Sequence, residues 1–408
     1  MKSVKSLALT KAWAGKQEIK NLRKVAERIK KAVKRKERII LYGDADLDGV
    51  ASVIILKETI KNLGGEISAI YFPDREKEGY GINKIALNFL KSKARALFIA
   101  LDCGIGNFKE TELAKELGFE VIIIDHHQVL DAFPKAEIIV DPHQKGDKYS
   151  FKGLATVGIS FKLSELIFRG KMTPSLRKNF LELTALGTIA DMMPRESENK
   201  IFIEEGTSSF ERSWRPGLRA FFETEPFKDE LNLNQKISRI ISILNVRDVE
   251  NNFPASFRLL TFSSVEEAKE LLAKLLGKSV QRKEKIEKTV EEVEQRISKT
   301  PEPIIFEGDS NWDFTLISAV ASIICQKYQK PTFVFKKLEK ESIGTVRTPA
   351  GIDSVSLMKK CSQYPITYGG HPLASGFRIK NENLEQFKQC LINHLAKRTS
   401  SSSSPSLP

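Results

Sequence analysis

The chain has 408 residues, 41% of them hydrophobic and 29% charged, which is typical of a soluble globular protein long enough for two domains. Its 65 Lys plus Arg against 52 Asp plus Glu give a formal net charge of +13. This excess favours a polyanionic partner such as nucleic acid, although a merely basic protein would show it too. No run of about twenty apolar residues occurs, so no membrane-spanning helix is expected, and the basic N-terminus lacks the apolar core of a secretory signal.

The first part of the chain predicts an α/β domain. Residues 1–37 form a basic segment, in which KNLRKVAERIKKAVKRKER (20–38) reads as an amphipathic helix with a solvated face. From Arg38 to about Asp141, apolar strand runs alternate with helical stretches. This alternation predicts a largely parallel sheet covered by helices on both faces. The strand runs are RIILYG, EISAIYF, ALFIALD, EVIIID and EIIVD.

The middle of the chain is predicted to be helical. Two helical segments, LATVGISFKLSELIF and RKNFLELTALGTIADMM, complete a first domain over 38–205. Residues 206–300 contain few strand patterns and end in KSVQRKEKIEKTVEEVEQRI, a long charged helix with an apolar seam. Such a helix suits a connector between two lobes, so we expect a helical connector over 206–300.

A second, smaller α/β domain is predicted over 301–397. Its strands are PIIF, PTFVF and SIGTVR, and its helices span 314–328, 353–361 and 384–396. The Ser-rich stretch 398–408 has low complexity and is expected to be a disordered tail.

The cysteine pattern predicts a reduced protein. The four cysteines, Cys103, Cys325, Cys361 and Cys390, lie far apart and form no CxxC pair. This spacing argues against a disulfide framework or a zinc ribbon and indicates a reducing, cytoplasmic location. His394, in the last predicted helix, is expected at the surface.

The strongest functional pattern is GDADLDG (43–49), directly after the strand run RIILY. Its three carboxylates, Asp44, Asp46 and Asp48, would repel one another unless a cation lay between them. The next helix begins at Gly49, so these acids fall in a strand-to-helix loop, where open α/β sheets bind ligands. The loop length and terminal Glu of an EF-hand are absent. Alone, the motif also fits a solvated acidic turn.

Other segments end in residues of the same kind. The strand run ALFIAL leads into Asp102, VIII leads into Asp125-His126-His127, and the helix LTALGTIADMMP carries Asp191 near its end. The carboxyl ends of parallel strands meet at one edge of a sheet. Carboxylates with one or two imidazoles suit Mn²⁺ or Mg²⁺ better than Zn²⁺. The pattern therefore predicts two such ions, which together would clamp a phosphodiester and lower the pKa of a bound water.

These motifs resemble those of the DHH phosphoesterases and, within that family, the RecJ-like exonucleases. The matching stretches are, in order, GDADLDGVAS, LDCG, IDHH, GTIADMMP and, in the second lobe, GGHPLASG (369–376), the signature of a DHH-associated domain. Further RecJ-like stretches are PDREKEGYGIN, TVGISFKL and RPGLRAFFE. The resemblance spans about residues 38–390 and implies a catalytic DHH domain over 38–205 and a substrate-binding domain over 301–397.

The resemblance also implies how two ions would be held. Asp102 would bridge them, and His127 would face the scissile phosphate as a charge stabiliser or proton donor. The implied ligands are Asp44, Asp46 and Asp102 for the first ion and Asp48, Asp102, His126 and Asp191 for the second.

The family further implies contacts with the phosphates or terminal nucleotide of the substrate. RecJ-like proteins have a connector segment resembling PRINAAGR. The corresponding segment in this chain is KISRIIS (236–242), which keeps one arginine, Arg239. The two glycines of the GGH loop would let backbone N–H groups approach a phosphate. The implied substrate-binding residues are Arg75, Arg239, Arg347, Gly369, Gly370 and His371.

The activity implied by the resemblance is metal-dependent, 5′-to-3′ exonucleolytic release of 5′-mononucleotides from single-stranded DNA or RNA, with replication or repair proteins as candidate partners. A nano-RNase or another small-substrate phosphodiesterase is an alternative, since no segment remains for the OB-fold of long bacterial RecJ proteins. A non-catalytic, replication-associated binding protein is disfavoured because every acidic and histidine position is retained. The oligomeric state stays open.

Overall fold

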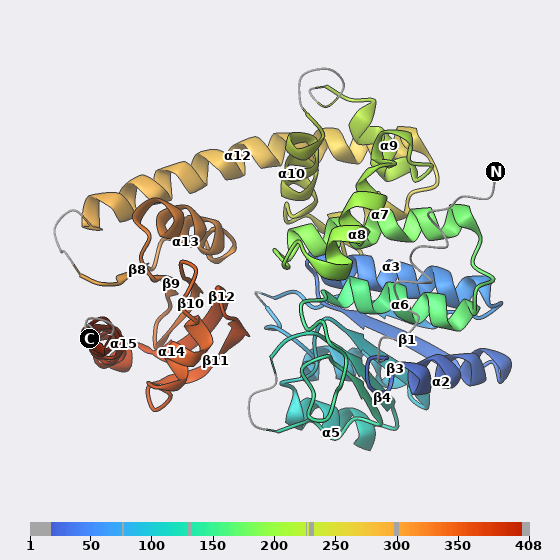
Figure 1. The fold of residues 1–408 in the computed structure, drawn as a ribbon, viewed down its shortest axis with the longest axis horizontal. Helices are drawn as coiled ribbons and strands as arrows, with labels where there is room; N and C mark the ends of the chain where they lie inside the picture. The colour runs from blue at the N-terminus through green and yellow to red at the C-terminus, as the bar shows by residue number, and fades with distance from the viewer. Residues whose placement is uncertain are drawn as a thin grey trace, which may run out of the picture. The chain divides into compact units, whose positions relative to one another are not determined.

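The structure is a computed structural model in which the chain forms two compact units, Met1–Gly277 and Lys278–Pro408. Each unit has a hydrophobic core and a five-stranded sheet of its own (Figure 1). Within the described part of the chain, no helix is both long and apolar enough to cross a membrane. The described residues are 18–75, 77–128, 132–225, 227, 232–297 and 302–401.

The first unit is built on a parallel sheet with the strand order β2-β1-β3-β4-β5. Runs of Val, Ile and Leu form the central strands because both faces of the sheet are buried. Gly43 pairs with Leu101 and Leu101 with Ile124, so three neighbouring strands end side by side. The strands are β1 (Arg38–Gly43), β2 (Ala69–Tyr71), β3 (Ala96–Leu101), β4 (Glu120–Ile124) and β5 (Ile138–Val140).

Helices cover both faces of this sheet, as Figure 1 shows. Ile39 and Leu41 of β1 belong to one hydrophobic cluster, and Ile40 and Tyr42 belong to another. This alternation follows from the two-residue period of a strand. The predicted α/β fold is confirmed. The first cluster includes α2 (Leu22–Lys34), α3 (Leu47–Asn62), α6 (Thr156–Phe168) and α7 (Pro174–Ala190), and the second includes α4 (Lys84–Leu90) and α5 (Phe108–Glu116).

The basic N-terminal segment contributes one helix to this core. The apolar stripe of α2, which includes Val25 and Ile29, is fully buried, while its lysines remain at the surface. Arg28, at the edge of the stripe, pairs with Glu37 and Glu120 at 2.6 Å. Residues 1–17 of the expected segment lie outside the described residues.

The helices after α8 (Ser197–Thr207) pack onto the first unit. Leu218 and Phe221 of α9 and Leu260 of α11 are buried in the same cluster as α3. The unit boundary at Gly277 falls inside α12, a single helix of 33 residues. The elements here are α9 (Pro216–Phe222), α10 (Leu233–Leu244), the hairpin of β6 (Val249–Glu250) and β7 (Phe253–Pro254), α11 (Ala255–Thr261) and α12 (Val265–Ile297).

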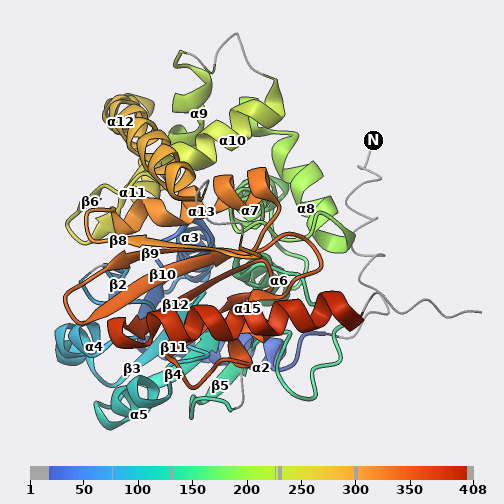
Figure 2. The same cartoon turned by 90° about the vertical axis from the view of Figure 1, so that its left-hand side faces the viewer.

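The second unit has a mixed sheet in the order β11-β12-β10-β9-β8, in which only β8 and β9 are parallel. Phe333 and Phe335 pack against the C-terminal helix that crosses one face (Figure 2), and Val334 packs on the other. The elements are β8 (Ile305–Asp309), α13 (Phe314–Tyr328), β9 (Thr332–Lys337), β10 (Glu341–Arg347), α14 (Ser354–Lys359), β11 (Pro365–His371), β12 (Ala374–Lys380) and α15 (Leu384–Ser401).

One expectation about this unit was wrong. The GGH segment, expected as a loop, is the end of strand β11, because residues 369–371 pair with 374–376 of β12 across a tight turn. Of the stretch 398–408, predicted as a disordered tail, residues 398–401 form the end of α15 and residues 402–408 lie outside the described residues.

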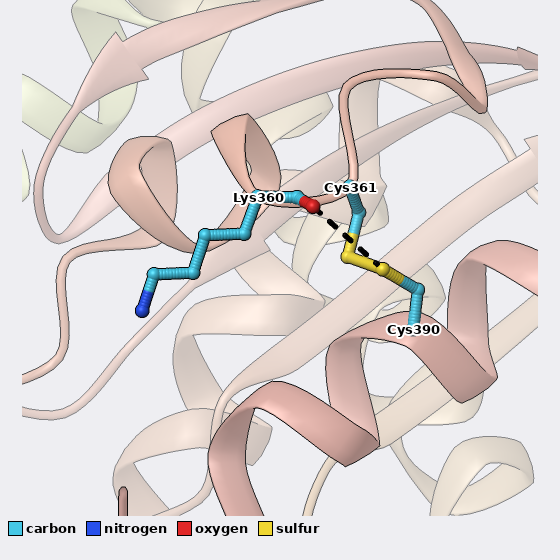
Figure 3. The surroundings of a disulfide bond; sticks show 3 residues. All are labelled: Lys360, Cys361 and Cys390. Carbon is cyan, nitrogen blue, oxygen red and sulfur yellow. Dashed lines mark hydrogen bonds between the residues drawn. A yellow bond between two sulfur atoms is a disulfide. The ribbon is translucent and has the colours of Figure 1, made fainter. Parts of the chain in front are cut away.

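The cysteine spacing argued against a disulfide framework, but one pair of cysteines is bonded. Cys361 and Cys390 are joined by a disulfide, with their Cα atoms 6.1 Å apart (Figure 3). The cysteines are 29 residues apart in the sequence, but the turn after α14 packs beside α15 and brings them together. Cys103 and Cys325 are free and buried.

Candidate metal centre

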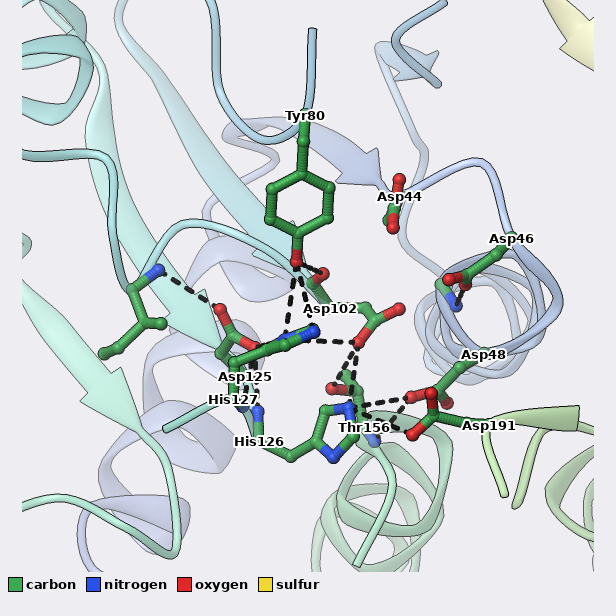
Figure 4. Close-up of polar contacts among 12 residues, drawn as sticks. Asp44, Asp46, Asp48, Tyr80, Asp102, Asp125, His126, His127, Thr156 and Asp191 are labelled. Atoms are coloured by element: carbon green, nitrogen blue, oxygen red, sulfur yellow. Dashed lines mark hydrogen bonds and ion pairs between the residues drawn. The ribbon is translucent and has the colours of Figure 1, made fainter. Parts of the chain in front are cut away.

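Three strands of the first unit deliver acidic side chains to one edge of the sheet (Figure 4). Asp44, Asp102 and Asp125 directly follow β1, β3 and β4. The hydrogen bonding of the sheet continues through them, since Asp44 N donates to Leu101 O at 3.1 Å and Asp102 N to Ile124 O at 3.0 Å. All three side chains are buried. The strand ends thus meet as the parallel pattern predicted.

The first turn of α3 places the other two acids of the GDADLDG motif. Asp46 is the N-cap of α3, and its carboxylate accepts a hydrogen bond from Gly49 N at 3.1 Å. A Cβ atom at Gly49 would lie 2.8 Å from Asp44 N, which no side chain tolerates. Glycine at this position therefore lets the helix start close against the strand that carries Asp44.

Asp48 is fixed by the start of another helix. Its carboxylate accepts hydrogen bonds from Thr156 N at 2.9 Å and Val157 N at 2.7 Å, the free N–H groups at the beginning of α6. The Thr156 hydroxyl donates to Asp102 Oδ1 at 3.2 Å. Thr156 was not singled out in the sequence, because a threonine at the start of a helix is an ordinary residue there.

Three carboxylates converge on His126, as Figure 4 shows. Its Nε2 atom lies 3.5 Å from Asp48 Oδ2, 3.3 Å from Asp102 Oδ1 and 3.4 Å from Asp191 Oδ2. Asp191 is the C-cap of α7, and its Oδ2 atom is buried without a hydrogen bond from any described residue. Ligands about 2.1 Å from an octahedral ion lie about 3 Å apart. The spacing and the donor types therefore fit a hard divalent cation.

Asp102 belongs to three groups of possible ligand atoms, one of which it forms with Asp125 and His127. The other two groups consist of ligands implied by the sequence. Oxygen atoms of Asp44, Asp46 and Asp102 lie within 4.8 Å of one another, and so do ligand atoms of Asp48, Asp102 and His126. The two groups share only Asp102 among these residues. This arrangement has the form required for two ions with one bridging carboxylate.

The electrostatics of the cluster favour cation binding. Burial raises the pKa of Asp102 well above its usual range, and the neighbouring carboxylates raise it further. Burial and Asp46 raise the pKa of Asp48 to about 7, and burial also raises the pKa of Asp191. Carboxylates with such values resist ionisation together. A divalent cation would relieve the repulsion.

Arg75 supplies positive charge at the edge of the cluster. Its Nε atom donates to Asp44 Oδ1 at 2.8 Å, and Nη2 donates to Asp46 Oδ2 at 2.8 Å and to Asp44 Oδ2. The sequence implied a contact between Arg75 and substrate, and the structure places the guanidinium on two of the implied metal ligands. Tyr80, which the sequence did not single out, donates from its hydroxyl to Asp102 O at 3.0 Å.

Asp125 orients His127. Its Oδ1 atom lies 2.8 Å from His127 Nδ1 and accepts from His126 N at 2.8 Å, and its Oδ2 atom accepts from Ile105 N at 3.1 Å. Burial lowers the pKa of His127, but the charge and hydrogen bond of Asp125 outweigh this and raise it to about 9. In the metal-free protein these contacts favour the cationic form of His127. The ligand assignment from the sequence did not include Asp125, although the sequence placed it beside His126 and His127.

The implied substrate-binding residues of the second unit lie on one sheet. Arg347 and His371 are both directly opposite Ala374 of β12, so their side chains lie on the same face. Ser318 and Ser322 of α13 accept hydrogen bonds from Arg347 at 2.6 and 3.0 Å. Gly370 has φ 132°, and a Cβ atom there would lie 2.7 Å from Ala374 O. Gly369 precedes it in the same strand.

Arg239, the remaining implied substrate-binding residue, belongs to the first unit. It is exposed on α10, and its guanidinium lies 5.6 Å from the centre of the Phe227 ring. Among the described residues, it is not one of those that contact one another around Asp102.

The fold and this cluster define an α/β protein with a carboxylate and histidine metal centre. The model of the DHH family, N-terminal domain, matches residues 38–188, and that of the DHHA1 domain matches residues 302–397. The chain is a RecJ-like member of the DHH family.

Its relatives include the single-stranded-DNA-specific exonuclease RecJ of Bacillus subtilis (strain 168), which is 32% identical over 388 residues. That match covers 94% of this chain and 48% of the relative, so the chain spans about half of the relative's length. A crystal structure of exonuclease RecJ bound to manganese is 26% identical, with a TM-score of 0.73 over 93% of this chain and 95% of that one. RecJ from Thermus thermophilus in complex with Mn²⁺ is 25% identical, with a TM-score of 0.77 over 93% of this chain and 55% of that one.

Proposed function

We propose that the chain is a divalent-metal-dependent exonuclease that shortens single-stranded DNA or RNA. The observation that carries this proposal is the position of Asp102, shared by two groups of ligand atoms at the carboxyl edge of the sheet. The names of the RecJ relatives support it. Because nucleic acid is the proposed substrate, we also propose the cytoplasm as its compartment.

The ligand set follows from the two groups around Asp102. Mn²⁺ or Mg²⁺ bound there would clamp a phosphodiester and make a water nucleophilic at neutral pH. The Thr156 hydroxyl and the N–H groups at the start of α6 hold the carboxylates of Asp102 and Asp48, and the Tyr80 hydroxyl binds the backbone oxygen of Asp102. The proposed ligands are Asp44, Asp46 and Asp102 for one ion and Asp48, Asp102, His126 and Asp191 for the other.

Other side chains would act on the substrate. Asp125 favours the cationic form of His127, which would stabilise charge on the scissile phosphate. Arg75 would exchange its carboxylate partners for a substrate phosphate once cations neutralise Asp44 and Asp46. In the second unit, Arg347 and His371 would bind a phosphate of the strand, while Arg239 would contact it from α10.

The test uses 20-mer DNA and RNA strands labelled at either end, incubated with Mn²⁺, Mg²⁺ or EDTA. We expect hydrolysis with either ion, none in EDTA and none by Asp102→Asn. The matched control Asp313→Asn removes a carboxylate from the N-cap of α13, where Asn caps equally well, and should retain full activity. Substantial turnover in EDTA or by Asp102→Asn would overturn the proposal.

The same reactions also determine the polarity of digestion, the substrate length and whether the chain is catalytic at all. Immediate release of labelled mononucleotide from 5′-labelled strands indicates 5′-to-3′ digestion, whereas a gradually shortening 5′-labelled ladder indicates the opposite polarity. Hydrolysis confined to very short oligomers would replace the exonuclease by a small-substrate phosphodiesterase. Binding of the strand without any hydrolysis would indicate a non-catalytic binding protein.

A further inference from the structure

A second group of possible metal ligands lies in the other unit, on α15 and beside it. Cys390 and His394 are four residues apart on this helix, so their side chains lie on the same face. Cys361 follows α14 and is bonded to Cys390 (Figure 3). The two Sγ atoms and a ring nitrogen of His394 all lie within 4.8 Å of one another.

The surroundings make this group accessible from one side. Cys361 is fully buried in the Phe-rich core of the second unit. Cys390 and His394 are half-buried and line a hollow of about 530 Å³, together with Tyr364 and Asn393. His394 makes no hydrogen bond or ion pair with any residue that the structure describes. An ion could therefore enter from the hollow and meet an imidazole that has no competing partner.

We propose that Cys361, Cys390 and His394 bind one zinc ion when the disulfide is reduced. Two molecules of a thiol reductant become a disulfide, and the two cysteine sulfurs each gain an electron and a proton. Zinc then binds two thiolates and the neutral imidazole, and the two cysteine protons leave to solvent. Three protein ligands leave the fourth position of a tetrahedral zinc to water from the hollow.

The ligand chemistry distinguishes this site from the carboxylate cluster of the first unit. Two thiolates and an imidazole are soft and borderline ligands that select zinc, whereas the Asp-rich cluster suits Mn²⁺ or Mg²⁺. With Zn–S about 2.3 Å and Zn–N about 2.0 Å, ligand atoms of a tetrahedral site lie about 3.3–3.8 Å apart. The three atoms already lie within 4.8 Å, so reduction of the S–S bond leaves only a small rearrangement.

The disulfide and the zinc ion would tie together the same two segments. Each joins the turn after α14 to α15, which covers the buried residues Phe333 and Phe377. The cross-link over this core would thus persist in reducing and oxidising conditions, by a metal in one and by a covalent bond in the other.

Cobalt(II) tests the proposal, because thiolate-bound cobalt has a sulfur-to-metal charge-transfer band that carboxylate sites lack. The full chain is reduced with a phosphine, the phosphine is removed, and the protein is titrated with Co²⁺. We expect a saturable band that Zn²⁺ abolishes and that excess Mn²⁺ leaves unchanged. Reoxidation to the disulfide should remove it. Cys390→Ser should lose the band, and His394→Gln should weaken cobalt affinity about tenfold or more.

Cys325→Ser, at a buried cysteine of α13 in the same unit, is the matched control and should keep the full band. The Tm of the reduced wild type should rise with Zn²⁺ in saturating Mn²⁺, and that of His394→Gln should rise less. This second measurement remains informative if Cys390→Ser folds poorly. A reduced wild type without the band, a band unchanged in His394→Gln, or a Tm that Zn²⁺ does not raise would each overturn the proposal.

Discussion

Asp125 controls the charge of His127 through a direct hydrogen bond, and this pair can be tested alone. The charge and hydrogen bond of Asp125 raise the pKa of His127, so Asn in place of Asp125 should lower this pKa. Because the cationic imidazole is the proposed partner of the phosphate, activity is lost as pH rises through this pKa. Asp125→Asn should therefore move the alkaline limb of the kcat profile to lower pH by about 1–3 units, the usual effect of losing one adjacent opposite charge.

A kcat–pH profile of Asp125→Asn and wild type, each with saturating Mn²⁺, provides the measurement. His127→Gln should remove the same limb in both backgrounds, since the titrating group is then absent. An alkaline limb that stays in place in Asp125→Asn would show that another group controls it.

The carboxylate of Asp102 should destabilise the folded protein when no metal is bound. It is buried, and burial raises its pKa well above the usual range, so its ionised form is disfavoured in the folded state. Asn conserves the Oδ1 acceptor of the Thr156 hydrogen bond and tolerates the φ of 63° at this position. In EDTA, Asp102→Asn should be more stable than wild type by about 1–2 kcal/mol, a Tm increase of about 2–8 °C.

The same variant should lose most of the Tm increase that Mn²⁺ gives the wild type, because a ligand that binds only the folded state stabilises it. Thermal melts in EDTA and in Mn²⁺ measure both effects. A Tm of Asp102→Asn below that of the wild type in EDTA would mean that the Asp102 carboxylate stabilises the metal-free fold.

At the scale of elements, the start of α3 depends on Gly49. A Cβ atom there would lie 2.8 Å from Asp44 N and 2.9 Å from Asp44 C, so Gly49→Ala must push the strand end and the helix apart. We expect a loss of about 1–3 kcal/mol in stability. We also expect Mn²⁺ affinity to fall at least about tenfold, since ligands must be held within a fraction of an ångström.

Gly106→Ala is the matched control, because nothing lies within 4 Å of a Cβ atom there. Calorimetric Mn²⁺ titration of both variants gives the affinities. Equal affinity of Gly49→Ala and Gly106→Ala would show that the helix start can move without disturbing the ligands.

The elements also show why part of the site was predictable. Asp44, Asp102 and His126 stand at the ends of apolar strand runs, and parallel strands end at one edge, so their proximity followed from the pattern. Asp191 comes from a helix, so the rule for strand ends did not place it, and it was grouped with them by residue type and by the family motif. The contacts of Thr156 and Tyr80 depend on how α6 and the 77–83 segment fold onto that edge, which no local pattern encodes.

The second unit was less predictable for similar reasons. Its strands β11 and β12 hold the glycine-rich segment 369–376, where strand propensity is low and pairing across the turn decides the structure. The bond between Cys361 and Cys390 depends on the packing of α15, and a separation of 29 residues carries no information about it.

At the scale of the whole molecule, the proposed reaction requires both units. Each unit has its own core and sheet, and the proposed metal ligands all belong to the first. The second unit contributes Arg347 and His371, two side chains on one face of its sheet that can carry positive charge or donate hydrogen bonds. Their proposed task is therefore binding of the strand, which implies an effect on KM more than on kcat.

Arg347→Ala and His371→Ala should each raise KM with single-stranded substrate about ten- to a hundredfold, because a lost charge-assisted phosphate contact costs about 1.5–3 kcal/mol. Arg378→Ala is the matched control on the same sheet, since this exposed arginine pairs with Glu341. Mn²⁺ affinity should be unchanged in all three, because the ligands belong to the other unit. Steady-state kinetics and Mn²⁺ titration separate the effects, since a fall in kcat at unchanged KM would assign the second unit to the chemical step instead of to binding.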